Sequence, residues 1–214
     1  MPISPDHPHQ GQPVLRAGLP LGEARAAVVL IHGRGGTAQS MFGLVDAFAV
    51  PGLAFLAPQA AGRTWYPQRF IAPLAANEPW LSSALRAVGE VVAECQRSGI
   101  GPERVVVAGF SQGACLSLEF AARHPRRYGG ILAFSGGLIG PPEAPRSIAA
   151  GLAGTPIFLG CSDEDAHIPL GSVHASSAAL RAAGAAVTEK IYPGMGHEIV
   201  EDELDQARAI LTRV

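Results

Sequence analysis

Residues 105–116 read Val105-Val106-Val107-Ala108-Gly109-Phe110-Ser111-Gln112-Gly113-Ala114-Cys115-Leu116, and this stretch decides the fold predicted for the chain. Its first four residues form a short, mostly β-branched apolar run, which is typical of a buried strand. The next five fit the pattern G-x-S-x-G, and the residues from Ala114 to about Ala122 favour a helix. The stretch therefore predicts a strand, a sharp turn and a helix in immediate succession.

The geometry of this turn explains why both of its flanking residues are glycine. A serine at such a turn has a strained backbone, and its neighbours two residues away must lack side chains so that strand and helix approach closely. The Ser111 hydroxyl then lies at the start of a helix, where the dipole and free N–H groups favour negative charge on a reacting oxygen. A glycine-rich strand-to-helix turn also occurs as a purely structural connection, so partners for Ser111 must be found elsewhere.

Composition limits the classes of function. A chain of 214 residues, 48% hydrophobic and 16% charged, predicts one globular domain with a large core. A net charge of −2 with scattered basic residues gives no reason to expect a nucleic-acid partner. The longest apolar runs, about six residues, are far shorter than the ~20 of a membrane span. We therefore expect a soluble protein that crosses no membrane.

The cysteines and histidines bear on the compartment and on bound metals. Cys95, Cys115 and Cys161 form no C-x-x-C pair, which favours a reduced cytoplasmic compartment, and the N-terminus does not resemble a secretory signal. Cys115 follows Ser111 by four residues and is expected in the core rather than in redox chemistry. The seven histidines contain no H-E-x-x-H motif, and their one H-x-H triplet, His7-Pro8-His9, lies in the proline-rich N-terminal stretch, so we predict no metal site. We also predict no cofactor.

Strand and helix patterns alternate along the chain. An edge strand is predicted at 14–21, and buried strands at 26–31, 52–58, 105–108, 130–137 (running into a glycine turn), 155–161 and 186–192. Helices are predicted at 38–49, 81–97, 114–122, 170–183 and 199–211. This order predicts the α/β class, with a mostly parallel central sheet, helices on both faces and sites at the carboxyl ends of the strands. We expect residues 1–13 to form a loose N-terminal arm, residues 14–214 a single domain, and residues 138–154 a minimal lid.

The strand at 26–31 ends in a glycine loop, His32-Gly33-Arg34-Gly35-Gly36. A dinucleotide fingerprint would need G-x-G-x-x-G and a downstream acid, and this loop keeps only the G-x-G start. The alternative is an oxyanion loop, in which the backbone N–H groups of Arg34 and Gln112 bind a developing negative charge. Each such donor typically contributes roughly 3 kcal/mol of transition-state stabilisation. His32 is expected to be structural.

Residues 59–79 have no helical period and contain several aromatic side chains. A long irregular segment in a compact domain is usually functional or disordered, and the aromatic residues argue against disorder. We predict that this segment supplies apolar walls to a substrate pocket, chiefly through Trp65 and Phe70, although the same aromatic side chains would also suit a satellite core. Met195, in the last glycine-rich loop, is a third predicted pocket residue.

A base and an acid follow Ser111 along the chain. His197 lies in a glycine-rich loop after the last strand, and an imidazole with a pKa near ~6.5 is suited to removing the serine proton. An acid must then hold the imidazole in the correct tautomer. The loop 163–165 offers three carboxylates, of which Asp165 is our choice and Asp163 the alternative.

Five motifs together resemble the phospholipase/carboxylesterase family of small α/β-hydrolases, which includes acyl-protein thioesterases: His32-Gly33-Arg34-Gly35, Gly109-Phe110-Ser111-Gln112-Gly113, Phe134-Ser135-Gly136-Gly137, Asp165-Ala166-His167-Ile168-Pro169 and Gly194-Met195-Gly196-His197. The similarity covers about residues 26 to 213. It implies an α/β-hydrolase fold, a triad of Ser111, Asp165 and His197, an oxyanion hole from Arg34 and Gln112, and Trp65 in the pocket. Arg34 stands where acyl-protein thioesterases carry an apolar residue.

The predicted function is a serine hydrolase that cleaves small carboxylic esters or thioesters through an acyl-enzyme. The alternatives are an acyl-protein thioesterase or lysophospholipase, a perhydrolase or lactonase on the same triad, and a ligand-binding receptor with negligible turnover. The Arg34 side chain would either attract an anionic substrate or point to solvent. A small-molecule ester is the expected partner, and the sequence leaves a homodimer open.

Overall fold

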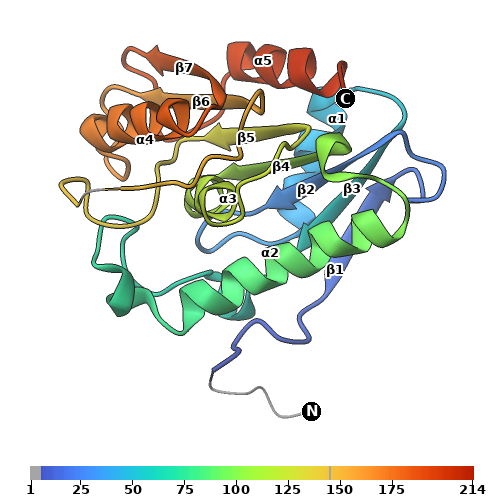
Figure 1. The fold of residues 1–214 in the computed structure, drawn as a ribbon, viewed down its shortest axis with the longest axis horizontal. Coiled ribbons are helices and arrows are strands. Elements are labelled where there is room, and N and C mark those ends of the chain that lie inside the picture. The colour runs from blue at the N-terminus through green and yellow to red at the C-terminus, as the bar shows by residue number, and fades with distance from the viewer. Residues whose placement is uncertain (1–5, 145) are drawn as a thin grey trace.

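The computed structural model describes residues 6–144 and 146–214, and its centre is a seven-stranded sheet (Figure 1). The strands are β1 (Val14–Gly18), β2 (Ala26–Ile31), β3 (Leu53–Pro58), β4 (Val105–Phe110), β5 (Gly130–Phe134), β6 (Pro156–Ser162) and β7 (Ala186–Tyr192). Their order in the sheet is β1-β3-β2-β4-β5-β6-β7. Only β1 runs antiparallel to its neighbour, so the predicted mostly parallel sheet is confirmed.

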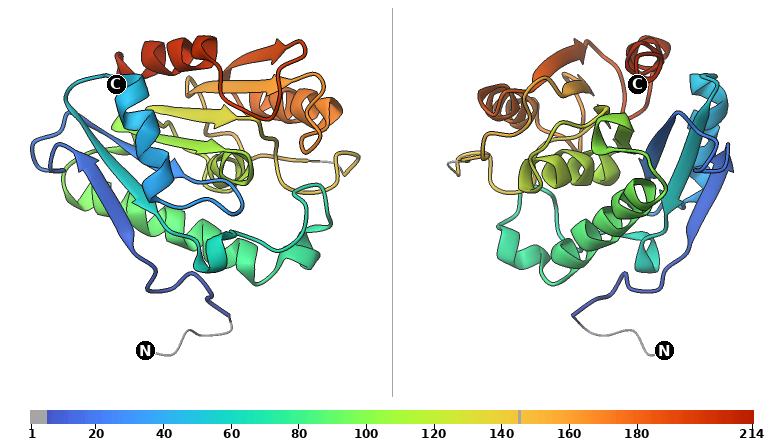
Figure 2. Two further views of the ribbon diagram at one scale, coloured as in Figure 1. Left: turned by 180° about the vertical axis from the view of Figure 1, so that it is seen from behind. Right: turned by 45° about the vertical axis from the view of Figure 1, so that its right-hand side comes forward.

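Helices cover both faces of this sheet (Figure 2). One face packs against α1 (Gly43–Phe48) and α5 (Glu201–Leu211), which contact each other. The other face packs against α2 (Trp80–Arg97), α3 (Gln112–Arg123) and α4 (Leu170–Ala182). The predicted helices on both faces are therefore confirmed, with the short α1 preceded by a 3-10 turn over Gln39–Phe42.

The continuous apolar runs in the sequence form strands that are buried from both sides. All six residues of β2 are buried, and so are all six of β3. Because alternate side chains of a strand point to opposite faces, Val29 and Ile31 join one core cluster while Val28 and Leu30 join the other.

The register of the parallel strands aligns their carboxyl ends. Ile31 pairs with Gly109, Phe110 with Phe134, and Ser162 with Tyr192. The loops that follow β2, β4, β5, β6 and β7 therefore leave the sheet along one edge, as expected for a site at the carboxyl ends of parallel strands.

Part of the N-terminal segment that we expected to be a loose arm is held against the domain at His9, within the stretch that the structure describes from Asp6 onward. His9 is only 4% exposed, and its backbone N–H donates to Ser83 Oγ at 3.0 Å. Its ring donates from Nε2 to the carbonyl of Trp65 at 2.9 Å and accepts the Ala61 amide at Nδ1 at 3.1 Å. Burial lowers the pKa of His9, which favours the neutral ring that these two bonds require. Residues 1–5 of the expected arm lie outside the described residues.

Candidate active site

The turn between β4 and α3 holds Ser111 in a strained conformation, with φ 55° and ψ −118°. A Cβ at Gly113 would overlap the carbonyl oxygen of Ile31, and a Cβ at Gly109 would overlap the backbone of Gly113. Both positions therefore require glycine for steric reasons. The Ser111 amide donates to Phe134 O on β5 at 2.9 Å, which fixes the turn against the neighbouring strand.

Three side chains from separate loops meet at this turn. Ser111 Oγ lies 2.8 Å from His197 Nε2, and His197 Nδ1 lies 2.6 Å from Asp165 Oδ2. With a carboxylate beside Nδ1, the ring carries its proton on Nδ1 and presents Nε2 as the acceptor for the serine hydroxyl. The His197 ring also packs against the rings of Phe110 and His167, each with a centroid distance of 4.9 Å.

The structure separates the two candidate acids. The Asp165 side chain is fully buried, and its second oxygen accepts the amides of His167 at 2.8 Å and Ile168 at 3.1 Å. Burial alone would raise its pKa, but the hydrogen bonds from His197 and these amides hold the pKa below the ordinary value. Asp163 instead accepts the amide of Gly194 at 2.9 Å and so braces the loop that carries His197.

The loop after β2 lies beside the serine. A Cβ on Gly33 would come within 3.3 Å of the Ser111 Cβ, and the Gly36 amide donates back to Gly33 O at 3.0 Å to close the turn. Among the described residues, the Arg34 and Gln112 amides donate no hydrogen bond. The Gln112 amide at the start of α3 and the Arg34 amide in the loop after β2 are therefore both available to a ligand.

The side chains of these two residues brace the segment after β3. Gln112 Oε1 accepts the Trp65 amide at 2.8 Å, while its Nε2 donates to Tyr66 O at 2.8 Å. The Arg34 guanidinium donates to the carbonyl oxygens of Tyr66, Pro67 and Gln68 at 2.7 to 3.0 Å. Neither sequence interpretation of Arg34, as an anion ligand or as a side chain pointing freely to solvent, anticipated these three bonds.

His32 has the structural role predicted for it. The ring is fully buried, with Nδ1 donating to Gly33 O at 2.8 Å and Nε2 accepting the Ala60 amide at 3.1 Å. Burial lowers its pKa, so the ring is held neutral. Trp65 stacks near it at a centroid distance of 5.0 Å and donates from Nε1 to the His32 carbonyl at 2.8 Å.

A cavity of about 440 Å³ opens above Ser111. Its walls come from the loop after β2, the segment after β3, the serine turn with the first turns of α3, and the loops after β6 and β7. The lining residues are Gly33, Arg34, Tyr66, Pro67, Gln68, Arg69, Phe70, Phe110, Ser111, Gln112, Cys115, His167, Ile168 and His197. None of these residues belongs to the segment 138–154, so the described part of the expected lid forms no wall of this cavity.

Two of the three predicted pocket residues lie elsewhere. Phe70 lines the cavity, but Trp65 does not, because its indole is fully buried beneath the oxyanion loop with its N–H satisfied there. Met195 is 8% exposed and is also not a wall residue, because its turn closes onto Tyr192 and the neighbouring His197 ring faces the cavity instead. Of the three, only Trp65 is part of the core without lining the cavity.

Several wall residues were not selected from sequence. Cys115 is one helical turn beyond Ser111, a spacing that places it on the same side of α3, although its thiol is buried and its pKa is raised to about 12 by that burial. His167 lies two residues after the acid, and Phe110 is the first variable position of the serine motif. Tyr66 and Arg69 belong to an irregular segment, where no periodic pattern shows which side chains face inward.

Within residues 6–144 and 146–214, no cluster of three or more His, Cys, Asp or Glu residues is placed to hold a metal ion. None of the helices described there is long and apolar enough to cross a membrane.

A mostly parallel sheet with the serine turn after β4, and with the acid and the histidine at later strand ends, defines the class of α/β-hydrolases. The model of the phospholipase/carboxylesterase family matches residues 19–214, and the chain belongs to this family. A solved phospholipase/carboxylesterase from Dyadobacter fermentans is 42% identical, with a TM-score of 0.89 over 94% of this chain and 97% of that one.

Curated relatives include thioesterases. Acyl-protein thioesterase 1 of Gibberella zeae is 36% identical over 125 residues, which are 54% of this chain and 50% of that protein. Acyl-protein thioesterase 1 of Eremothecium gossypii is 28% identical over 210 residues, covering 88% of this chain and 87% of that one. The match to the first of these relatives therefore spans half its length.

Proposed function

We propose that this protein is a serine hydrolase that cleaves small carboxylic esters or thioesters through an acyl-enzyme. The observation that carries the proposal is the relay of Ser111, His197 and Asp165, with distances of 2.8 and 2.6 Å, opening into a cavity of about 440 Å³. A serine hydroxyl becomes a useful nucleophile when a base within hydrogen-bond distance accepts its proton, and this geometry provides that base.

In the proposed reaction, Ser111 Oγ attacks the substrate carbonyl carbon while His197 Nε2 takes the hydroxyl proton. The carbonyl oxygen becomes an oxyanion, bound by the Arg34 and Gln112 amides. His197 returns the proton to the leaving alcohol or thiol, and the acyl group stays on Ser111. A water molecule then gives its proton to His197 and attacks the acyl carbon, which releases the acid and restores the serine. Asp165 stabilises the imidazolium at both steps.

Hydrolysis of p-nitrophenyl esters from acetyl to decanoyl tests this function. Ser111→Ala and His197→Ala should each lower turnover by roughly 10³-fold or more. The matched controls are Ser82→Ala and His174→Ala, which change an exposed serine and an exposed histidine outside the cavity. Native protein no more active than the two active-site variants at any chain length would refute the general esterase function.

The relatives' names favour one finer alternative, the hydrolysis of acyl thioesters on proteins. The hydrolysis of lysophospholipids stays a second alternative. Comparing thioester and oxygen-ester substrates of equal acyl length separates this alternative from a small-ester enzyme. Peroxide-dependent oxidation of a halide would instead reveal a perhydrolase, and hydrolytic opening of a lactone ring would reveal a lactonase. Tight retention of a ligand without turnover would reveal a receptor. The cytoplasmic location and the homodimer stay predictions.

The charges of the cavity favour an anionic over a cationic substrate. Arg34 and Arg69 line it, while no Asp or Glu does so among the described residues. The Arg69 side chain is exposed and makes no ion pair in the part of the chain that the structure describes. It is therefore the better placed of the two to meet a substrate carboxylate at the entrance.

An exposed ion pair contributes about 0.2–1 kcal/mol, so Arg69→Gln should lower kcat/KM on a carboxylate-bearing ester by up to about fivefold. Its kcat/KM on the neutral ester of the same size should not change, and high salt should remove the difference. Arg97→Gln, which changes an exposed arginine at the end of α2, is the control. Equal effects of Arg69→Gln on both esters would refute the charge preference.

A further inference from the structure

The strap Gly137–Gly140, which follows β5, is held by each of its four backbone amides. In chain order they donate to Cys115 Sγ at 3.4 Å, Ser176 Oγ at 2.8 Å, Glu119 Oε2 at 3.0 Å and Phe70 O at 2.7 Å. Two of these acceptors are on α3, one is on α4, and one is in the segment after β3. All four N–H groups of this irregular segment are therefore satisfied although it has no strand partner.

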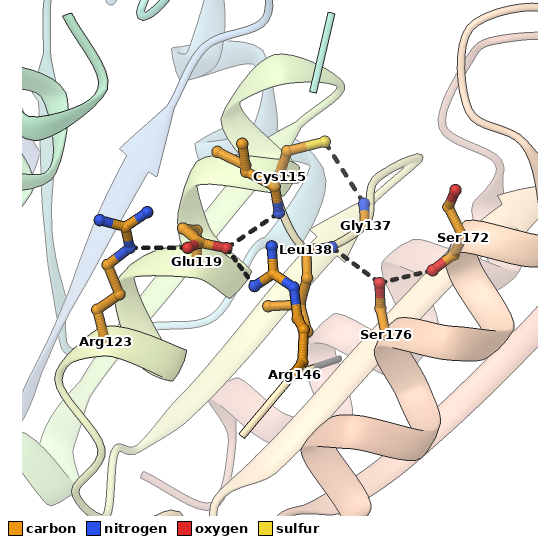
Figure 3. Close-up of polar contacts among 9 residues, drawn as sticks. Cys115, Glu119, Arg123, Gly137, Leu138, Arg146, Ser172 and Ser176 are labelled. Atoms are coloured by element: carbon orange, nitrogen blue, oxygen red, sulfur yellow. Dashed lines mark hydrogen bonds and ion pairs between the residues drawn. The ribbon is translucent and has the colours of Figure 1, made fainter. Parts of the chain in front are cut away.

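Glu119 is the charged centre of this arrangement (Figure 3). Its side chain is 3% exposed, and its Oε1 accepts from Arg123 Nε at 2.7 Å. Its Oε2 accepts from an Arg146 guanidinium nitrogen at 2.8 Å in addition to the Ile139 amide. A buried carboxylate is tolerated when such charge-assisted bonds satisfy it, and losing one partner leaves part of its charge uncompensated.

The two arginines connect this carboxylate to different parts of the chain. Arg123 lies on α3 itself, four residues after Glu119, so its ion pair stays within one helix. Arg146 lies beyond the strap, so its ion pair ties the chain after the strap to α3. A Cβ on Gly140 would come within 3.0 Å of the Arg146 guanidinium, which places this side chain directly against the end of the strap.

The strap in turn supports a wall of the catalytic cavity. Phe70 is 5% exposed and lines the cavity, and its carbonyl accepts the Gly140 amide. Its ring packs against Gly137, where an added Cβ would come within 3.1 Å of Phe70 Cε2. The helix that begins beside Ser111 therefore holds, through Glu119 and the strap, an aromatic wall of the cavity that Ser111 also lines.

We propose that Glu119 is a positioning residue that fixes the strap, and with it Phe70, at a set distance from Ser111 and thereby limits the length of the acyl group. This inference rests on the proposed hydrolase function. When the tie through Arg146 is lost, the strap and Phe70 move away from α3 and the cavity accepts longer chains. Bond making at Ser111 and His197 is left unchanged, because neither residue contacts Glu119.

The test compares Arg146→Met with Arg123→Met on the p-nitrophenyl ester series. Each substitution removes one arginine from the same carboxylate, but only Arg146 connects to the strap. For Arg146→Met we expect the ratio of kcat/KM on octanoyl to acetyl ester to rise by roughly tenfold, which corresponds to about 1.4 kcal/mol. Its kcat on the acetyl ester should stay within about twofold of native, and Arg123→Met should leave the ratio within about twofold.

A readout that needs no turnover accompanies the kinetics. Amide hydrogen exchange of the strap residues 137–140, whose Gly140 N–H donates to Phe70 O, should accelerate in Arg146→Met and stay native in Arg123→Met, because only Arg146 packs against the strap. Native protein without esterase activity, together with this exchange difference, would refute the proposed function and support the positioning role. Equal exchange in both variants, or an acyl ratio that both change alike, would overturn the positioning role. Glu119→Gln, which keeps an acceptor for the Ile139 amide, replaces Arg146→Met if that variant does not fold.

Discussion

Replacing Glu203 with glutamine should change how the stability of this protein depends on pH. Glu203 lies on α5 with its side chain fully buried against β6, where a Cβ on Gly160 would overlap its Oε1. Its Oε2 accepts the Val200 amide at 3.0 Å, and its Oε1 has no hydrogen-bond partner among the described residues. Burial raises the pKa of Glu203 to about 7, and the nearby Asp202 adds to this rise while the Val200 amide opposes it.

The size of the effect follows from this pKa. In the unfolded chain the carboxyl has its ordinary value of 4.5, so between 4.5 and about 7 the folded state holds a proton that the unfolded state has lost. Stability therefore falls as pH rises through this window, by about 3 kcal/mol in all. About 2 kcal/mol of this is lost between about pH 5.5 and pH 8. Glutamine cannot ionise and still accepts the Val200 amide, so the variant escapes this loss.

Thermal unfolding of native and Glu203→Gln protein at both pH values measures the effect. We compare the melting temperature of the variant with that of the native protein at each pH. For a domain of this size, this difference should shift in favour of the variant by about 4–8 °C from about pH 5.5 to pH 8. Glu23→Gln, which removes an exposed carboxyl, is the control and should show no such gain. A difference between native and Glu203→Gln protein that does not vary with pH would refute the assignment of a raised pKa to Glu203.

Three further predictions concern the site. Gly113→Ala should destabilise the fold by about 3 kcal/mol in urea unfolding, because its Cβ would overlap the Ile31 carbonyl, whereas Gly171→Ala, with open space around it, should not destabilise it. Arg34→Ala should lower kcat/KM equally on neutral and carboxylate-bearing esters, since its guanidinium is bonded to three carbonyls; a selective loss on the anionic ester would contradict this. Cys115, buried and with a pKa of about 12, should resist thiol reagents until urea unfolds the protein, and labelling of the folded protein at that site would show the contrary.

Sequence patterns predicted the fold correctly where one physical requirement produces both the residue pattern and the structure. β2 is a continuous apolar run because both of its faces are buried. The glycines two residues before and after Ser111 are required because α3 approaches β4 at Gly109 and the end of β2 at Gly113. The order of serine, acid and histidine along the chain follows from the order of strand ends, so their meeting could be expected before any distance was known.

The parts that could not be predicted depend on which way a side chain turns in an irregular segment. Trp65 and Tyr66 are adjacent and both aromatic, yet the first supports the oxyanion loop from below and the second lines the cavity. The amino-acid sequence offers no pattern that distinguishes the roles of these two aromatic residues. His9 likewise lies in a stretch rich in proline and polar groups, and its burial depends on acceptors and donors of residues more than fifty positions away.

Ser111 and His197 are separated by 86 residues, and the histidine stands after the last strand of the sheet. During synthesis, at roughly 5–20 residues per second, the nucleophile therefore exists for several seconds before its base has been made. On the proposed mechanism, an unfinished chain does not hydrolyse esters, and neither does a chain truncated anywhere before β7. The onset of hydrolysis in a refolding experiment would then time the docking of the C-terminal strand, a late, long-range event, rather than the formation of the central strands.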